Sequence, residues 1–196
     1  MPSIIQASAN TQYYLNLEEK FGAHNYHPLP VVLAKGKGVF VWDVDNKRYY
    51  DFLSGYSAVN QGHCHPKIIE ALIEQAQKLT LTSRAYYNNL LGAYEAFITG
   101  YFGYQKVLPM NSGVEAVETA LKLCRKWAYK VKGISEGQAK IIVCDGNFHG
   151  RTINVISFSN DPTAKNNYGP FTPGYQSIPH NDLQALENAF QDKNVC

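Results

Sequence analysis

The sequence KVLPMNSGVEAVETALKLCRKWAYKVK (residues 106–132) organises the rest of the chain. Its short apolar run Val107-Leu108 leads into a polar turn, Asn111-Ser112-Gly113, and then into a segment whose apolar residues recur at spacings of three and four. That spacing is the period of an amphipathic α-helix. The apolar stripe consists of Val114, Val117, Leu121, Cys124, Ala128 and Val131. The stretch therefore predicts a strand, a tight turn and a helix, with Asn111 or Ser112 as the N-cap.

The start of this predicted helix is suited to an anion. Glu115 and Glu118 lie in its first turns and Arg125 and Lys126 lie later, which is the charge order that a helix dipole favours. Gly113 permits a close approach to the backbone, and the free N–H groups of a helix N-terminus bind phosphate well. An ordinary strand-to-helix turn has the same pattern, so this stretch alone leaves both interpretations open.

Composition and charge exclude several classes of protein. The chain of 196 residues is 45% apolar and 17% charged, an ordinary globular mixture with room for one or two domains. Its net charge of +2 contains no basic block, so nucleic acid and anionic membrane surfaces are not the expected partners. No targeting segment or long apolar span is visible. We expect a soluble cytoplasmic protein, or a mitochondrial matrix protein whose transit peptide has been removed.

The cysteines do not indicate a disulfide framework or a metal site. Cys64, Cys124, Cys144 and Cys196 are scattered without a Cys-x-x-Cys pair, which predicts reduced thiols. The sequence His63-Cys64-His65 contains zinc-ligand residue types, but adjacent positions rarely converge on one ion, and no second pair has ligand spacing. We therefore expect no metal.

The remaining elements follow from periodicity and turn residues. We expect a short helix over 11–21, an irregular arm over 22–30 and an antiparallel meander over 31–52. Two helices should follow, over 66–79 and 88–102. Beyond the central helix, 140–144 predicts a buried strand, 160–179 a loop, 182–191 a helix and 194–196 the start of a strand. The buried stripes predicted for the helices after the meander are Ile68, Ile69, Leu72, Ile73, Ala76 and Leu79, then Leu91, Tyr94, Ile98 and Phe102.

This order of elements predicts a doubly wound α/β sheet. Residues 1–60 would form an arm and meander belonging to a small domain, and 61–196 the first part of a larger α/β domain. Such sheets bind ligands beyond the carboxyl ends of their strands. The turns at those ends, residues 111–113 and 146–151, should lie side by side.

The second turn carries chemistry that complements a phosphate site. Phe148 could stack on a planar ring, and Arg151 could bind a carboxylate with two hydrogen bonds. Phe148 could equally be a core aromatic residue and Arg151 a member of a surface ion pair. His149 could be a general base or a loop histidine hydrogen-bonded to backbone. Together the two turns favour a phosphorylated aromatic cofactor and an amino or keto acid substrate.

Four motifs, in order and spacing, resemble the class III pyridoxal-phosphate aminotransferases of fold type I. They are GKGVFVWDVDNKRYYDFLSG (36–55), GHCHP (62–66), NSGVEA (111–116) and FHGR (148–151). Three further stretches resemble more narrowly the ornithine aminotransferases within that family: AHNYHPLP (23–30), YSAVNQGHCHP (56–66) and LTSRAYYN (81–88). The resemblance extends from about residue 12 to residue 196.

The resemblance implies a role for each matched cofactor residue. The backbone of Gly113 and Val114, with Ser112 beside them, would hold the phosphate of pyridoxal 5'-phosphate, and Phe148 would stack on its pyridine ring. The family reaction transfers the δ-amino group of L-ornithine to 2-oxoglutarate and gives glutamate 5-semialdehyde and glutamate. A homodimer or higher homo-oligomer is also implied.

The substrate residues implied by the resemblance come from three separate stretches. Tyr26 and Arg151 would hold the α-carboxylate of ornithine, and Tyr56 would shape the pocket for its δ-amino group. The FHGR turn also occurs in acetylornithine aminotransferases, so Tyr26 and Tyr56 carry the narrower assignment.

The chain departs from the family pattern in one respect. No lysine present falls in the family's Schiff-base lysine motif, so that lysine, and the acidic partner of the pyridine nitrogen, are expected beyond Cys196. The 196 residues then correspond to about the N-terminal half of an aminotransferase, hold no catalytic residue of their own and should not transaminate alone. Alternatives are a class III enzyme acting on acetylornithine or 4-aminobutyrate, or a short non-catalytic protein that binds phosphate ligands or a full-length homologue.

Overall fold

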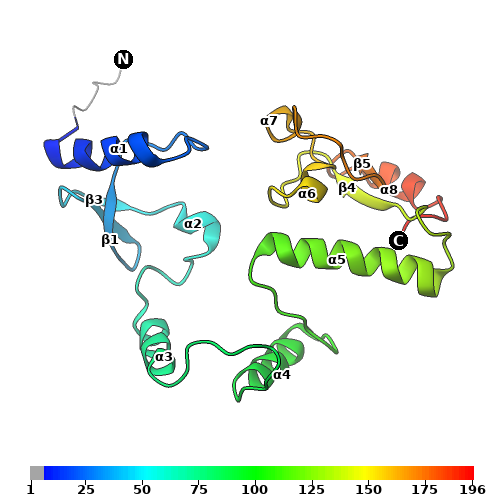
Figure 1. The fold of residues 1–196 in the computed structure, drawn as a ribbon, viewed down its shortest axis with the longest axis horizontal. Helices are drawn as coiled ribbons and strands as arrows, with labels where there is room; N and C mark the ends of the chain where they lie inside the picture. Colours follow the sequence, from blue (N-terminus) through cyan, green and yellow to red (C-terminus); the bar gives the residue numbers. More distant parts are fainter. Residues whose placement is uncertain (1–6) are drawn as a thin grey trace. The chain divides into compact units, whose positions relative to one another are not determined.

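The computed structural model describes residues 7–196, which divide between two compact units, Met1–Asn88 and Asn89–Cys196 (Figure 1). The first unit begins with helix α1 (Ala9–Phe21) and the predicted antiparallel meander. Its strands β1 (Leu33–Lys37), β2 (Phe40–Asp43) and β3 (Arg48–Tyr50) pair in sequence order. The prediction of a meander over 31–52 is confirmed.

Asp43 holds the turn between β2 and β3. Its carboxylate accepts hydrogen bonds from the Tyr49 hydroxyl at 2.7 Å and from the backbone N–H groups of Lys47 at 2.9 Å and Asp45 at 3.0 Å. The hydrogen bond from Tyr49 lowers the pKa of Asp43 and raises the pKa of Tyr49 to about 12. The ionised form of Asp43 is therefore part of the folded state.

Two further carboxylates join the meander to its neighbours. Asp45 accepts hydrogen bonds from Ser8 at 2.6 Å and Thr11 at 2.7 Å, which attach α1 to the turn and lower the pKa of Asp45. Asp51 accepts the backbone N–H of Ser54 at 2.8 Å and lies 2.7 Å from Nε2 of His63. Both hydrogen bonds lower the pKa of Asp51, the one from Ser54 more than the one from His63.

The helical part of this unit differs from expectation in burial. The turn α2 (Ser54–Ser57) has positive φ at all four residues, so it is left-handed.

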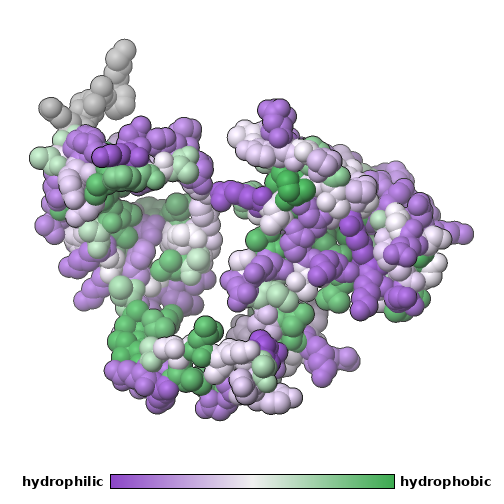
Figure 2. All heavy atoms as spheres, viewed as in Figure 1, coloured by the Kyte–Doolittle hydropathy of each residue, from purple (hydrophilic) through white to green (hydrophobic). Residues whose placement is uncertain are grey.

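Helix α3 (Pro66–Ala76) is amphipathic as predicted, but no residue in it is buried, and Leu72 is 63% exposed. Figure 2 shows hydrophobic residues gathered on its surface. The predicted buried stripe is wrong for this chain, because periodicity identifies the apolar face of a helix but not what covers it.

The second unit contains the predicted central helix and strands. The predicted stripe of helix α4 (Leu91–Phe102) is also largely uncovered, since Tyr94 is 49% and Phe102 61% exposed. The order of elements is α4 (Leu91–Phe102), α5 (Gly113–Trp127), the π-helical turn η1 (Ala128–Lys132), β4 (Ile141–Cys144), α6 (Ile153–Ile156), α7 (Pro162–Lys165), β5 (Tyr175–Ile178) and α8 (Leu183–Ala189).

Two details of the predicted sheet are wrong. Val107-Leu108 forms no strand, and β5 lies within 160–179, which was expected to be loop. Strand β5 pairs in parallel with β4, with Ile141 opposite Tyr175, and Val195 makes an isolated parallel bridge to Lys140. The parallel α/β character of the unit is confirmed, although its strands are not all the expected ones.

Helix α5 packs on β4 through one apolar cluster. Leu121 of α5, Ile141 of β4, and Val155 and Phe158 in and after α6 are buried together. Further along, Ala128, Ile134 and Ala139 form a second cluster beneath η1. The buried residues of α5 and η1 therefore match the predicted stripe at Leu121 and Ala128, whereas Cys124 and Val131 are exposed.

We expect the Met1–Asn88 unit to lose stability in acid. The lowered pKa values of Asp43, Asp45 and Asp51 favour the ionised folded state, so their contribution is complete above the carboxyl pKa of the unfolded chain. That unfolded value is about 4, and the contribution is lost as pH falls through the folded pKa values below it. Urea unfolding at pH 7 and pH 3 should show the loss.

The matched variants are Tyr49→Phe and Tyr50→Phe. Tyr49→Phe removes the first cause of the lowered Asp43 pKa and should weaken the acid dependence. Tyr50 is exposed on the same strand, so Tyr50→Phe should retain the acid dependence of the wild-type chain. Identical acid dependence in both variants would contradict the assignment.

Candidate functional site

The N-terminus of α5 is fixed by a reciprocal capping arrangement. The Ser112 hydroxyl accepts the N–H of Glu115 at 3.3 Å, and the Glu115 carboxylate accepts the N–H groups of Ser112 at 3.0 Å and Asn111 at 2.8 Å. Ser112 is thus the N-cap, one of the two residues predicted. Within residues 7–196 the N–H groups of Gly113 and Val114 donate no hydrogen bond. A Cβ built on Gly113 would meet nothing within 4 Å, so the space beside Gly113 is open.

The turn after β4 is held by its own side chains. Asn147 donates from Nδ2 to the carbonyl of Cys144 at 2.7 Å and to that of Phe158 at 3.1 Å. Nδ1 of His149 lies 3.1 Å from Oδ1 of Asn147, and its ring packs edge-on against Phe158 at 5.5 Å. The partner of His149 is therefore a side-chain amide rather than backbone, and its surroundings favour a structural role over that of a general base.

Phe148 and Arg151 extend from this turn. Phe148 is 75% exposed, so it is not a core residue of this chain. The guanidinium carbon of Arg151 lies 6.0 Å from the centre of the Phe148 ring, at the outer limit of a cation–π contact. An exposed aromatic face and a guanidinium group therefore lie next to each other.

Gly150 brings this turn against the start of α5. Its φ of +119° is a conformation that side-chain-bearing residues rarely adopt, and a Cβ built there would lie 2.6 Å from Cγ2 of Val114. The two turns at the carboxyl ends of the predicted strands therefore lie side by side, which confirms the expectation. The structure thus brings together Ser112, Gly113, Val114, Phe148 and Arg151.

Tyr26 and Tyr56 belong to the other unit, Met1–Asn88. Tyr26 lies in a segment without regular structure and is 57% exposed. Tyr56 is 82% exposed and lies in the left-handed turn α2 with φ of 57°. A bulky residue in this conformation is strained, and such strain is concentrated at functional positions.

One contact was missed by the sequence analysis. The carboxylate of Glu118 accepts hydrogen bonds from Thr152, the N-cap of α6, and from Nδ2 of Asn154, the latter at 2.7 Å. The sequence analysis gave Glu118 a role only through its charge near the start of the helix. Glu118 lies four residues after Val114 and three before Leu121, so it is near the buried face of α5. This spacing is the sequence signal that could have predicted a contact with the rest of the unit.

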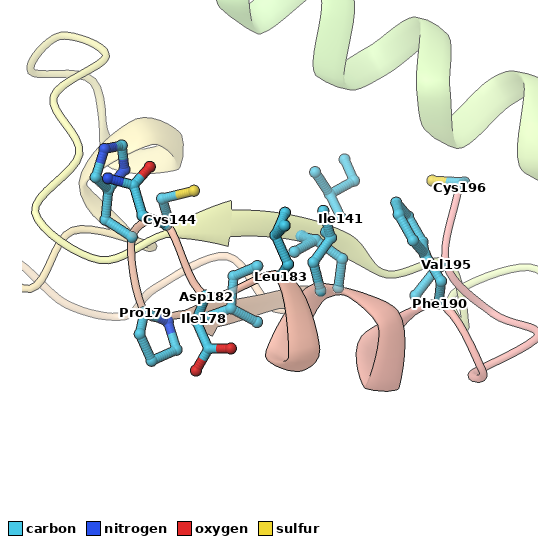
Figure 3. Close-up of a pocket in the computed structure, with 13 residues that line it drawn as sticks. Ile141, Cys144, Ile178, Pro179, Asp182, Leu183, Phe190, Val195 and Cys196 are labelled. Carbon is cyan, nitrogen blue, oxygen red and sulfur yellow. The ribbon is translucent and has the colours of Figure 1, made fainter.

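A separate hollow of about 430 Å³ lies beside the sheet, between the β4–β5 pair and α8 (Figure 3). Its walls include Ile141, Ile178, Leu183 and Phe190, with Cys144 and Asp182 toward the carboxyl ends of the strands. None of the seven predicted site residues lines it. The hollow is mainly apolar and is distinct from the two turns.

Across residues 7–196, no cluster of three or more His, Cys, Asp or Glu side chains could hold a metal ion, and His63 is instead hydrogen-bonded to Asp51. No helix in that range is both long and apolar enough to cross a bilayer.

The family follows from comparison with known proteins. The family model described as aminotransferase class-III matches residues 21–196. The chain therefore belongs to the class III aminotransferases. This membership agrees with the parallel α/β unit and with the two adjoining turns at the start of α5.

Individual relatives narrow the comparison. The mitochondrial ornithine aminotransferase of Rattus norvegicus is 60% identical over 191 residues, which are 97% of this chain and 44% of the relative. A solved ornithine aminotransferase from Toxoplasma gondii has a TM-score of 0.93 and 49% identity, covering 94% of this chain and 43% of that one. A solved acetylornithine aminotransferase from Elizabethkingia anophelis has a TM-score of 0.81 and 65% identity, covering 96% of this chain and 46% of that one. The chain thus spans less than half the length of these relatives.

We expect Gly150→Ala to destabilise the Asn89–Cys196 unit more than Gly146→Ala. Both glycines have positive φ, so both substitutions introduce backbone strain, but only the Cβ at position 150 would overlap Val114. The added overlap should cost about 1–3 kcal/mol in the free energy of unfolding. Urea unfolding of both variants measures the difference. Equal losses would show that the close contact with Val114 does not constrain the turn.

Proposed function

We propose that this chain belongs to an ornithine aminotransferase and supplies part of the binding site for pyridoxal 5'-phosphate and the substrate carboxylate. The observation that carries the proposal is the contact between Gly150 and Val114, which places an exposed ring and a guanidinium group beside a helix N-terminus. Three binding functions are then available together: phosphate, planar ring and carboxylate.

The residues present fit pyridoxal 5'-phosphate. The N–H groups of Gly113 and Val114 would bind its phosphate with the help of the helix dipole, and the Ser112 hydroxyl stands beside them. Glu115 already accepts the N–H groups of Asn111 and Ser112, so the backbone donors left for the phosphate in this turn are those of Gly113 and Val114. Phe148 would cover the pyridine ring. When bound, the cofactor supplies an electron sink for the carbon that loses a proton.

The substrate assignment rests on Arg151, Tyr26 and Tyr56. Arg151 would bind the α-carboxylate of L-ornithine, with the Tyr26 hydroxyl as a second donor, so that the δ-amino group is the one presented for transfer. Tyr56 would shape the pocket for that amine. The amino-group acceptor proposed is 2-oxoglutarate. Relatives named ornithine aminotransferase from rat and Plasmodium falciparum, at 60% and 59% identity, support the assignment.

The same proposal includes assembly, domain organisation and location. A homodimer or higher homo-oligomer would cover apolar surface such as the α3 stripe. Residues 1–60 would belong to a small domain and 61–196 to a large cofactor-binding domain. The compartment proposed is the cytoplasm or the mitochondrial matrix; the name of the rat relative includes a mitochondrial location, and that of the P. falciparum relative does not.

A second candidate substrate is N-acetylornithine. It is favoured by the 65% identity to the solved acetylornithine aminotransferase from E. anophelis. Acetylation removes the charge of the α-amino group, and the FHGR turn would bind the carboxylate of either substrate. The discrimination therefore depends on Tyr26 and Tyr56.

The test uses the complete protein, because this chain spans less than half of its relatives. With 2-oxoglutarate as acceptor, we expect kcat/KM for L-ornithine to exceed that for N-acetylornithine at least about tenfold, since a site built for a polar group discriminates against its altered form. Chromatography of glutamate and of the second product measures both reactions. Preference for N-acetylornithine would establish the second candidate, and turnover of neither would refute both.

Tyr26→Phe in the complete protein should raise KM for L-ornithine roughly ten- to hundredfold, the effect of one lost hydrogen bond to a charged group. The half-reaction with 2-oxoglutarate should change little, because the proposed contact is with ornithine. Tyr14→Phe, on exposed α1, is the matched control and should behave as wild type. Equal losses in both half-reactions would count against the role of Tyr26.

A further inference from the structure

We propose that Glu118 is a positioning residue that fixes the Phe148–Arg151 turn on the first turns of α5 and thereby sets the place of Arg151. The proposal deepens the proposed function and rests on it where it concerns substrate binding. Its structural part, the attachment of the turn through Glu118, stands on the contacts of this chain alone.

Glu118 uses both carboxylate oxygens for this attachment. Oε1 accepts the hydroxyl of Thr152, and Oε2 accepts Nδ2 of Asn154 at 2.7 Å. Glu118 and Asn154 are only partly exposed, and hydrogen bonds to an ionised acceptor are stronger than neutral ones. One side chain of α5 therefore holds two residues of the segment that begins α6.

A second link fixes the orientation of Asn154. The Tyr175 hydroxyl of β5 donates to Oδ1 of Asn154 at 2.6 Å, so that Nδ2 is the atom presented to Glu118. Burial raises the pKa of Tyr175, which keeps this phenol protonated as a donor. Arg125 packs on the Tyr175 ring at 5.1 Å and donates to the carbonyl of Pro173 at 2.6 Å. The network thus extends from β5 through α6 to two positions on α5.

Arg151 lies between two attachments to the same helix. On one side Gly150 is in close contact with Val114, and on the other Thr152 donates to Glu118. Val114 and Glu118 are four residues apart, so they lie on one face of α5 a turn apart. The backbone of Arg151 is consequently held at both ends. Because the donors of Gly113 and Val114 lie on the same helix end, Glu118 also sets the spacing between the proposed phosphate and carboxylate sites.

The test compares three variants of the complete protein: Glu118→Ala, Glu118→Gln and Asp182→Ala. Alanine removes both acceptors, whereas glutamine keeps an acceptor for Thr152 and presents a donor toward Asn154. Asp182→Ala removes a side-chain cap from a different helix, since Asp182 accepts the N–H of Ala185 at 2.8 Å in α8. It controls for general loss of stability.

The first measurement is amide hydrogen exchange in the cofactor-free protein. We expect peptides covering 147–157 to exchange at least about tenfold faster in Glu118→Ala, to a smaller degree in Glu118→Gln, and at the wild-type rate in Asp182→Ala. Unchanged exchange in Glu118→Ala, or equal acceleration in Asp182→Ala, would overturn the proposal. If Glu118→Ala does not fold, the comparison of Glu118→Gln with Asp182→Ala decides in the same way.

The second measurement is steady-state kinetics with L-ornithine. Displacing Arg151 should raise KM roughly ten- to hundredfold in Glu118→Ala, with a much smaller change in kcat and partial recovery in Glu118→Gln. A fall in kcat with unchanged KM would overturn the link to Arg151. The two failures are distinguishable: if wild type does not act on ornithine, the proposed function fails, while hydrogen exchange still tests Glu118.

Discussion

The close contact between the Gly150 backbone and the Val114 side chain is the constraint on which the candidate site depends. Helix α5 begins at a fixed place because Ser112 and Glu115 cap each other, so the turn after β4 must come to it. A glycine is needed at the point of contact, since a Cβ would overlap Val114. The consequence is that the groups proposed to bind the cofactor and the substrate have relative positions established before any ligand arrives, which would reduce the cost of binding.

The candidate site and the core of the second unit are built from neighbouring parts of the sequence. Val155 and Phe158 are buried with Leu121 and Ile141, directly after the turn that carries Phe148 and Arg151. The side chains proposed to bind ligands are thus only a few residues from buried anchors, as is common where loops extend from a rigid sheet. The folding of this cluster and the geometry of the turn cannot vary independently.

The sequence predicted elements whose signals are local. The helical period of α5, its N-cap and the turn residues of the meander depend on neighbours within a few positions. Strand β5 was missed because Tyr175–Ile178 lies among prolines and is extended mainly by pairing with β4, a distant segment. The residue types of the site were predictable from the two turns and the family resemblance. The bridging role of Glu118 was not, because it requires knowing that Thr152 and Asn154 pack against α5.

The left-handed turn at Ser54–Ser57 has a consequence for the stereochemistry of this chain. Ser54, Tyr56 and Ser57 have φ of 48°, 57° and 70°, a backbone that L-residues resist and that D-residues adopt readily. In a semisynthetic protein, D-tyrosine at position 56 would relax the backbone while directing the aromatic ring along a different bond vector. The natural L-tyrosine thus combines a mirror-image backbone with a side-chain direction that neither a right-handed turn nor a D-residue can reproduce.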